Sequence, residues 1–550
     1  MTIPAPGHPR GSWDCHPSLR ALLGRTLVLP VHPANNALRC GAHPDAPTSR
    51  VLPTSLPLGI GPLRPLQEPK VSALSEEKLD LPATAQPVHP DYRVISLIVG
   101  CAIFLEQVDG TVLATALPTM ARDFAVSAPA MSVAVTSYLL ALAILIPVSG
   151  AIADRFGTKR VFNSSIVVFI IGSVLCSLTH SLPMMVAARL VQGTGGAMMA
   201  PVGRLVILRT VDRKHLVSSM MWTLIPAVLG TMAGPPLGGF IVEYFDWRWI
   251  FYINVPIGVL GYWLVRRYIP VVTCTVRPAP FDWLGFALCS VGLGCLLFGL
   301  ELFGENTSPR NGVILVAIGA AACLAYVRHA RRREHPAVDL TLLRIDSFRL
   351  SVISGALMRI TQGAQPFLLP LLLQIGLGFS ALRSGQLILA ISLGALLARA
   401  LTTRLLRWIG FRRVMVYNGV LAGLSYAVCA FFRADWPFWL MFGLLACCGV
   451  IMSVQFTAYN TIAYEAVPTE RMSAANSFYS TLQQLMLSVG VCCGALILKL
   501  AMSASHNSEP SRLNFSVAFL VVTVISLSST HWHRAFAPDA GHEMSGHRQR

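Results

Sequence analysis

The chain is 550 residues long, and 54% of its residues are hydrophobic while only 13% are charged. A soluble globular protein carries about 25% charged residues, so this composition excludes a soluble enzyme and indicates a protein that crosses a membrane many times. In such a protein the net charge of +17 does not indicate nucleic-acid binding. The distribution of the Lys and Arg residues between the loops instead indicates which loops face the cytoplasm.

Residues 1–92 are rich in Pro and His and show no sustained apolar periodicity, which predicts a disordered cytoplasmic tail. The apolar patch from Arg20 to Val31 is too short to cross a bilayer and is broken by Arg25, so we predict no signal peptide. After Met1 the next methionine is Met120. We therefore expect translation to start at a non-Met codon near Val71, with much of the tail an artefact.

From residue 93 onward, apolar segments of the length that a helix needs to cross about 30 Å of hydrocarbon alternate with short loops. The sequence predicts fourteen spans, at 94–117, 130–152, 160–179, 183–206, 217–241, 249–266, 283–302, 312–328, 350–374, 383–403, 414–431, 437–457, 474–499 and 513–530. An all-α polytopic protein with this even number has both termini on one side. Alternate loops beginning at Asp154–Arg160, with the C-terminal tail, hold 23 Lys and Arg against 7 in the other set, so we expect both termini in the cytoplasm.

The first predicted span contains two acids, Glu106 and Asp109, inside an apolar run. A carboxylate at that depth is costly and indicates function. The two acids are three residues apart and share one face of a helix, which must look into protein or water. If they interact, their protonation is coupled, which suits proton exchange. The fourth span contains Arg189 and Gln192, and a buried arginine needs an anion, for which the two acids are the natural candidates.

A turn rich in charge joins the second and third spans. Its residues are Gly150, Asp154, Arg155, Gly157, Lys159 and Arg160. We interpret Gly150 as a close approach of helices, Gly157 as the turn and Asp154 with the basic residues as a charge latch; the simpler alternative is an ordinary positive loop. A similar turn, Arg407–Arg413, follows the tenth span, which predicts a duplication.

The duplication divides the chain into five parts. We predict a tail at 1–92, a six-helix bundle at 93–267, two inserted helices and a basic loop at 268–348, a second six-helix bundle at 349–530 and a tail at 531–550. Internal repeats of this kind are typical of secondary transporters, whose substrate sites lie between the repeats.

The fifth span is rich in glycine and proline at Gly230, Gly234, Pro235, Gly238 and Gly239. Small residues at four-residue spacing permit tight helix packing, and proline removes a backbone hydrogen bond. The span is therefore either a hinge or sealed seam, or a kinked helix without a mechanistic role.

Together these motifs resemble the major facilitator superfamily, in particular the fourteen-helix drug:proton antiporters of the EmrB/QacA type and their MdtD-like branch. The resemblance covers about residues 93–530. It implies that the 150–160 turn is the family's signature loop, that the segment from Arg189 to Gly193 takes part in proton transfer, and that the fifth span carries the antiporter motif associated with exporters. Glu106 departs from the family, which commonly has a neutral polar residue there.

The second half contributes further polar residues for a substrate cavity, namely Arg359, Arg399, Asn460, Asn476 and Gln483, to which Gln192 of the first half is added. Either arginine would attract an anionic substrate or neutralise a buried carboxylate. The three amides would line a cavity or join helices by hydrogen bonds.

We predict a transporter and no enzyme: a proton-driven exporter of hydrophobic or amphipathic compounds in the cytoplasmic (inner) membrane, with Asp109, Glu106 and Arg189 as the proton-coupling residues. The absence of a Walker A pattern indicates the proton gradient rather than ATP as energy source, with no cofactor or metal. The expected partners are small molecules, protons and lipid, with the chain as a monomer, no nucleic acid, and a periplasmic adaptor left open. The alternatives are a transporter of an organic anion, or a membrane sensor that keeps the fold without transporting.

Overall fold

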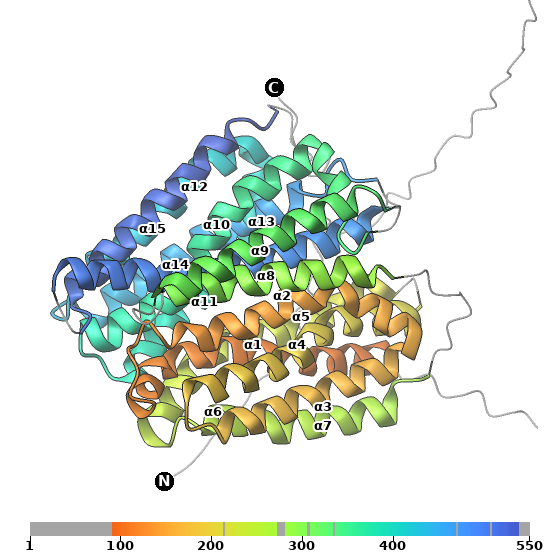
Figure 1. Cartoon of the computed structure of the whole chain (residues 1–550), viewed down its shortest axis with the longest axis horizontal. Coiled ribbons are helices and arrows are strands. Elements are labelled where there is room, and N and C mark those ends of the chain that lie inside the picture. Colours follow the sequence, from red (N-terminus) through yellow and green to blue (C-terminus); the bar gives the residue numbers. More distant parts are fainter. Residues whose placement is uncertain are drawn as a thin grey trace, which may run out of the picture. The chain divides into compact units, whose positions relative to one another are not determined.

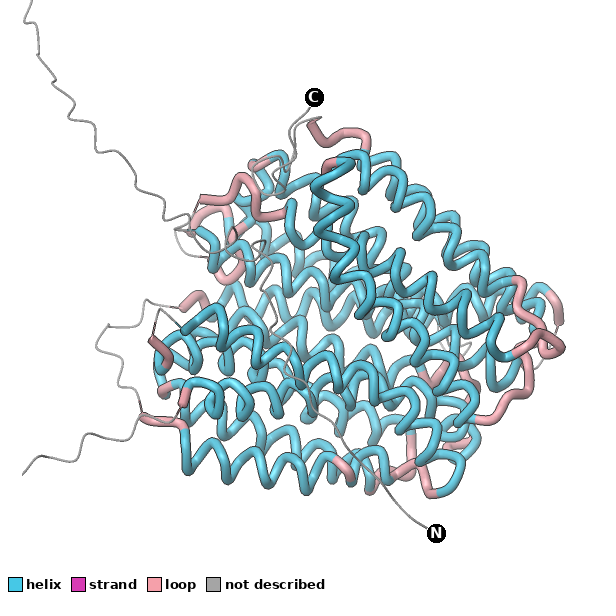
Figure 2. Tube along the Cα trace, turned by 180° about the vertical axis from the view of Figure 1, so that it is seen from behind, coloured by secondary structure: helices cyan, strands magenta, loops and turns pink. Residues whose placement is uncertain are grey.

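A computed structural model describes residues 91–212, 215–271, 281–304, 309–333, 336–468, 471–506 and 509–537. The described part is nearly all helix, as the apolar segments predict, and Figure 2 shows long helices joined by short loops. The N-terminal tail and the end of the C-terminal tail lie outside the described residues. The helices are α1 Tyr92–Asp123, α2 Ser132–Phe156, α3 Thr158–Ser177, α4 Leu182–Thr210, α5 Leu216–Tyr244, α6 Trp249–Tyr252, α7 Asn254–Tyr268, α8 Trp283–Gly304, α9 Pro309–Ala330, η2 Leu340–Arg344, α10 Asp346–Leu371, η3 Leu372–Gly376, α11 Ala381–Ile409, α12 Phe411–Ala430, α13 Phe438–Ile462, α14 Met472–Ala504 and α15 Arg512–His533.

Twelve of the described helical segments are long and apolar enough to cross a membrane by length and composition. Two predicted spans, 183–206 and 350–374, correspond to α4 and α10, which are long enough but lie outside these twelve. Both helices contain several charged residues, such as Arg189 in α4 and Arg359 in α10. The count of fourteen spans and the cytoplasmic position of the termini therefore stay predictions. The predicted span 249–266 is divided at Ile253 into α6 and α7.

The helices form two groups with a hairpin between them. Helices α1–α7 pack together, as do α10–α15, and α8 pairs with α9 between the groups (Figure 1). The groups meet where α5 packs against α11 and α2 packs against α14, while α8 lies against both α2 and α14. Helices α8 and α9 thus lie between the two groups, and the predicted division into domains stays a prediction.

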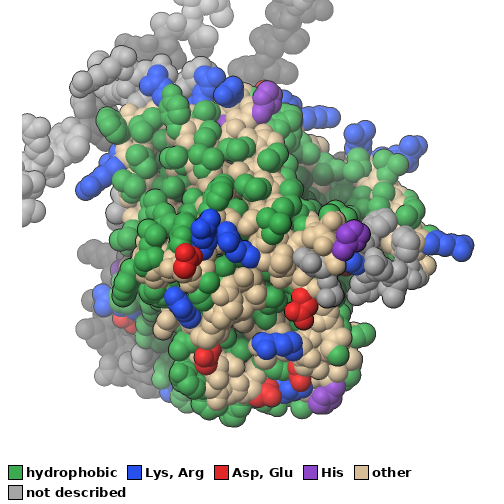
Figure 3. All heavy atoms as spheres, turned by 90° about the vertical axis from the view of Figure 1, so that its left-hand side faces the viewer, with side chains coloured by type: hydrophobic (Ala, Val, Ile, Leu, Met, Phe, Trp, Pro, Cys, Tyr) green, Lys and Arg blue, Asp and Glu red, His purple; other side chains and the backbone are tan. Residues whose placement is uncertain are grey.

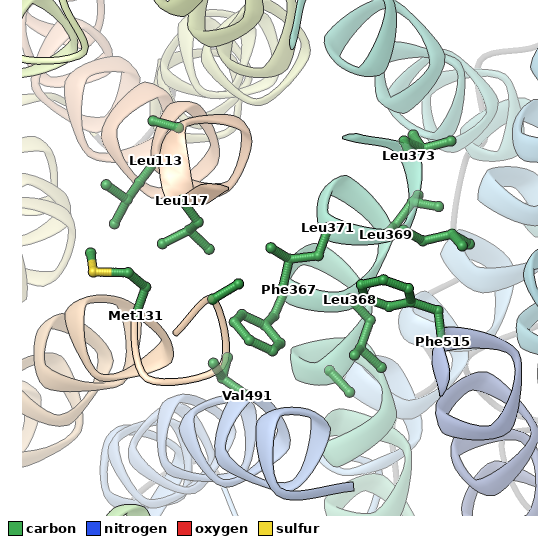
Figure 4. Close-up of a cluster of buried hydrophobic side chains, with 14 of the residues drawn as sticks. Leu113, Leu117, Met131, Phe367, Leu368, Leu369, Leu371, Leu373, Val491 and Phe515 are labelled. Atoms are coloured by element: carbon green, nitrogen blue, oxygen red, sulfur yellow. The ribbon is translucent and has the colours of Figure 1, made fainter. Parts of the chain in front are cut away.

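A large apolar cluster joins the two groups at the end of the helices that is distant from the Asp154–Arg160 turn. Leu113 and Leu117 of α1, Phe367 of α10 and Val491 of α14 are each at most 1% exposed and belong to it (Figure 4). The cluster therefore closes the space between the groups at this end.

The closed end carries the connection between α1 and α2. Figure 3 views the left-hand side of Figure 1, where this connection lies, and acidic and basic side chains are mixed there among hydrophobic ones.

Candidate functional site

Asp109 of α1 lies in the interior of the first bundle, where three side chains donate hydrogen bonds to its carboxylate. Arg189 Nη1 lies 2.7 Å from Oδ2, Gln192 Nε2 lies 2.7 Å from Oδ1, and Asn254 Nδ2 lies 3.1 Å from Oδ1. Asp109 is 3% exposed and Arg189 is 1% exposed. Separating such a pair would leave a buried charge without compensation. The pairing that the sequence predicts is present, and its role in proton transfer stays a prediction.

A second layer of hydrogen bonds fixes these donors. Ser173 Oγ of α3 lies 2.8 Å from Gln192 Nε2 and 3.2 Å from Asn254 Nδ2, and Gln192 Oε1 accepts from Arg189 Nη1 at 2.7 Å. The network thus connects α1, α3, α4 and the start of α7. Arg189 and Gln192 act together because residues three apart lie on the same side of a helix. Asn254 and Ser173 were not predicted, because single polar residues in apolar runs form no pattern in the sequence.

Arg189 has further contacts through its Nε and the flat face of its guanidinium. Its Nε donates to the carbonyl of Ala134 at 3.1 Å, and its guanidinium lies 4.3 Å from the ring centroid of Tyr138, both in α2. A cation over an aromatic face is stabilised by about 0.5–2 kcal/mol. Arg189 therefore keeps several partners that do not depend on the charge of Asp109.

Close packing of α3 against α4 brings Ser173 within hydrogen-bond distance of Gln192. A Cβ on Gly172 would overlap the backbone of Gln192, and one on Gly195 would overlap the backbone of Phe169. Gly172 and Gly195 therefore permit the close approach of α3 and α4.

Glu106 lies three residues before Asp109 but borders a different space. It lines a cavity of about 600 Å³ between the two bundles, and its Oε2 is buried without a hydrogen-bond partner among the described residues. The hypothesis that the protonation of the two acids is coupled stays a prediction, although they border different spaces. They do so because α1 has the packed interior of its own bundle on one side and the cavity on the other.

The cavity is formed by α1, α2, α4 and α5 of the first bundle and by α11, α13 and α14 of the second. Its lining includes Ile146, Arg204 and Thr223, from the parts of α2, α4 and α5 that lie toward the Asp154–Arg160 turn. A smaller pocket of about 230 Å³ adjoins it, since Thr231 lines both. The cavity is therefore on the side opposite the closing apolar cluster.

The predicted polar residues of the second bundle divide between the cavity and a buried cluster. Arg399, Asn476 and Gln483 line the cavity. Arg359 is 2% exposed, and its Nη2 donates to Asn460 Oδ1 at 3.2 Å and toward Gln483 Oε1 at 3.5 Å. Of the two alternatives predicted for Arg359, pairing with a buried carboxylate is not found among the described residues, because these hydrogen-bond partners are neutral.

The turn after α2 differs from its predicted chemistry at two residues. A Cβ on Gly150 would meet nothing within 4 Å, so this glycine is not a close approach of helices. Asp154 forms its ion pair with Arg209 at the end of α4 rather than with the basic residues of the turn itself. Gly157 turns the chain as predicted, since its φ is 88° and that of its counterpart Gly410 is 86°, values that favour glycine.

The basic residues after the two turn glycines also make matching contacts. Lys159 Nζ donates to the carbonyl of Arg266 at the end of α7 at 3.0 Å, and Arg412 donates to the carbonyl of Arg534 after α15 at 3.0 Å. Each turn therefore binds the last helix of its own bundle. This supports the predicted duplication, while Arg155 and Arg160 are exposed.

The glycines of α5 form a tight seam with two neighbouring helices. A Cβ on Gly230, Gly234 or Gly238 would overlap α1, and one on Gly239 would overlap the backbone of α11. Pro235 lines the smaller pocket. The predicted tight packing is confirmed, and α5 joins the first bundle to the second through it.

Sequence reasoning missed Glu301 of α8. Its carboxylate accepts hydrogen bonds from Thr136 Oγ1 at 3.0 Å and from Ser132 Oγ at 3.1 Å, both in α2, and Cys492 of α14 lies 3.3 Å away. An acid within an apolar helix was the signal that could have identified it. It ties the inserted pair to both bundles.

The chain has clear similarities to known proteins. A profile of the Major Facilitator Superfamily matches residues 99–491. The chain is 36% identical over 407 residues to the "Putative multidrug resistance protein MdtD" of Cronobacter sakazakii, covering 73% of this chain and 85% of that protein. It is 35% identical over 434 residues to the protein of the same name in Escherichia coli K12, covering 78% and 91%.

Solved structures show the same fold at low sequence identity. A D-xylose-proton symporter superposes with a TM-score of 0.57 at 14% identity, covering 81% of this chain and 98% of that chain. A POT family peptide transporter superposes with a TM-score of 0.58 at 14% identity, covering 83% and 97%. At this identity the likeness concerns the fold alone.

Proposed function

Because this chain belongs to the Major Facilitator Superfamily and is a multi-pass membrane transporter rather than an enzyme, we propose that it exports hydrophobic or amphipathic compounds in exchange for protons. The similarity to proteins named for multidrug resistance supports a broad range of substrates. The proposed location is the cytoplasmic membrane. The proposed mechanism is alternating access between two bundles with a site near the middle of the bilayer.

The observation that carries the proposal is the buried carboxylate of Asp109 with its cationic partner Arg189. In the bilayer a lone carboxylate is costly, and the ion pair makes the ionised form tenable. When Asp109 takes up a proton, Arg189 loses its counter-charge but keeps the Ala134 carbonyl and the ring of Tyr138. Proton binding thus changes the forces between α1, α2 and α4 without unfolding the site.

The proton steps of the cycle follow from this change. Asp109 binds a proton when the site is open to the outside, and the protonated acid releases Arg189 to its α2 partners. On the inner side the proton leaves, and the ion pair at 2.7 Å forms again. Substrate enters the cavity in the inward-open state and leaves when the closing apolar cluster has separated.

The seam of α5 supports export through the same movement. Glycines of α5 contact α1, which carries Asp109, and Gly239 contacts α11 of the second bundle. A change in α1 therefore reaches the interface between bundles through backbone contacts, which transmit small shifts because interiors are closely packed. The ion pair of Asp154 with Arg209 holds α2 and α4 together at the end of the helices that is distant from the closing apolar cluster.

The proposal is tested with the full chain in proteoliposomes of known orientation. An imposed proton gradient directed from the outer to the cytoplasmic side should drive efflux of a fluorescent lipophilic compound by wild type, and Asp109→Asn should lose this efflux. Asn keeps the size of the side chain but cannot carry the proton. Full gradient-driven efflux by the variant would overturn the assignment of Asp109 as the coupling acid.

A further inference from the structure

Three charged side chains line the large cavity. Glu106 has a buried oxygen without a hydrogen-bond partner among the described residues, and Arg204 and Arg399 are exposed. Glu106 and Arg204 belong to the first bundle and Arg399 to the second. The charges that face the cavity therefore sum to one positive charge when Glu106 is ionised.

A further cation lies directly behind the cavity wall. Gln483 lines the cavity and accepts from Arg359, whose guanidinium rests 4.4 Å from the ring centroid of Tyr479 and whose Nε is buried without a hydrogen-bond partner. Apart from Asp346 at the start of α10, helices α10–α15 contain no Asp or Glu. Among the described residues Arg359 therefore forms hydrogen bonds with neutral partners and no ion pair, and a buried cation of this kind is costly in a membrane.

The smaller pocket beside the cavity is apolar. It adjoins the cavity at Thr231 and is lined by Pro235, Leu369, Ile388 and Ile391, among others, on the side toward the closing cluster. An occupant that fills both spaces would place a charged group among the arginines and an apolar body in the smaller pocket.

We propose that the compound this transporter exports is an amphipathic organic anion, whose carboxylate or sulfonate is held by Arg399 and Arg204 and whose apolar body enters the smaller pocket. This inference rests on the proposed function, because it names the substrate class of the same site. The anion compensates Arg359 and Arg399, to which the helices of the second bundle offer no acid beyond Asp346, whereas a lipophilic cation would meet more positive than negative charge. Glu106 lies in the same bundle as Arg204 and across the cavity from Arg399, and its negative charge weakens the binding of the anion.

The charge moved in each cycle follows from the class of substrate. Exchange of one inward proton for one outward monovalent anion carries two positive charges inward. Exchange for a neutral compound carries one, and exchange for a monovalent cation carries none. Export of an anion is therefore driven by an inside-negative membrane potential in addition to the proton gradient.

The first test compares two probes with the same apolar body and opposite head charge, 1-pyrenesulfonate and 1-pyrenemethylammonium. Their binding to the full chain in detergent micelles is measured by fluorescence anisotropy without any gradient. Wild type should bind the sulfonate at least about tenfold more tightly than the ammonium, because one charge-assisted hydrogen bond contributes about this factor. Tighter binding of the ammonium would overturn the proposal.

Variants of Arg399 and Glu106 test whether the sulfonate binds in the large cavity. Arg399→Gln should weaken sulfonate binding about tenfold and should not weaken ammonium binding, and Arg399→Lys should restore most of the sulfonate affinity. Glu106→Gln should tighten sulfonate binding and weaken ammonium binding. Unchanged sulfonate affinity in Arg399→Gln, with the variant eluting as wild type in gel filtration, would overturn the assigned site.

Flux under a potassium diffusion potential with valinomycin gives the second test. Outward movement of 1-pyrenesulfonate at a fixed proton gradient should accelerate when the cytoplasmic side is made negative, and independence from the potential would contradict the assignment of an anion. Equilibrium binding does not involve Asp109. Loss of sulfonate preference therefore refutes this inference, whereas gradient-driven efflux that persists in Asp109→Asn refutes the proposed coupling.

Discussion

Replacement of Arg189 by Gln should expose the energetic cost of the buried pair. The substitution leaves Asp109 without the cation that lies 2.7 Å away, and breaking a buried pair in this way costs about 3–5 kcal/mol. It also removes the cation over Tyr138, which contributes up to about 2 kcal/mol. The single variant should therefore lose at least about 3 kcal/mol of unfolding free energy at pH 8, a loss measurable by equilibrium unfolding in mixed micelles with increasing SDS.

The double variant Arg189→Gln with Asp109→Asn separates the two contributions. The double variant no longer contains the uncompensated charge, although it still lacks the contact with Tyr138. It should therefore be more stable than the single Arg189 variant. Equal losses in the single and double variants would refute the account of Asp109 as a charge held by Arg189.

Two further predictions concern packing and a loop. Gly234→Val should abolish transport and lower thermal stability, because the added carbons would overlap Thr111 of α1. The control is Gly261→Ala, since a Cβ at this position meets nothing within 4 Å. Normal transport by Gly234→Val would contradict the tight packing of α5 against α1. Burial raises the pKa of Asp339, but the hydrogen bonds from Thr341 and from Arg471 Nη2, the latter at 2.7 Å, outweigh burial and lower the pKa below its ordinary value. The ionised Asp339 therefore stabilises the fold above about pH 4, and this stabilisation is lost as pH falls through the lowered pKa. Wild type should unfold at a higher temperature than Asp339→Asn at pH 7 with a smaller difference near pH 3, and a difference that grows on acidification would contradict this sign.

The sequence was sufficient for the class of fold and for the central ion pair. Long apolar segments predict membrane helices because the hydrocarbon thickness sets their length. Asp109 and Arg189 were predicted to pair because a charge in such a segment needs a partner, and each has few candidates. These inferences depend on composition and local spacing, which the sequence states directly.

Other parts of the site depend on the orientation of helices, which local spacing does not determine. Glu106 and Asp109 are close in the sequence, yet α1 separates the cavity from the bundle interior between them. The partner of Asp154 is Arg209, fifty-five residues later, and not the adjacent basic residues. The spacing gives a face of a helix, but only tertiary packing decides what that face contacts.

Glu301 shows a different reason for a missed residue. The rule that identified Asp109, an acid within an apolar span, applies equally to Glu301 in the predicted span 283–302. It was missed because no family motif marks the inserted helices. Its hydrogen bonds to α2 show that the insert is attached by polar contacts as well as by apolar packing.

The most direct test of the central claim records the protons themselves. Proteoliposomes with the cytoplasmic side inward, a trapped pH-sensitive dye and no initial gradient are loaded with 1-pyrenesulfonate and diluted, so that the compound leaves. Antiport through Asp109 predicts that the interior acidifies as the compound flows out, and that Asp109→Asn shows no acidification. An interior that turns alkaline, or a wild-type signal that persists in the variant, would contradict the account.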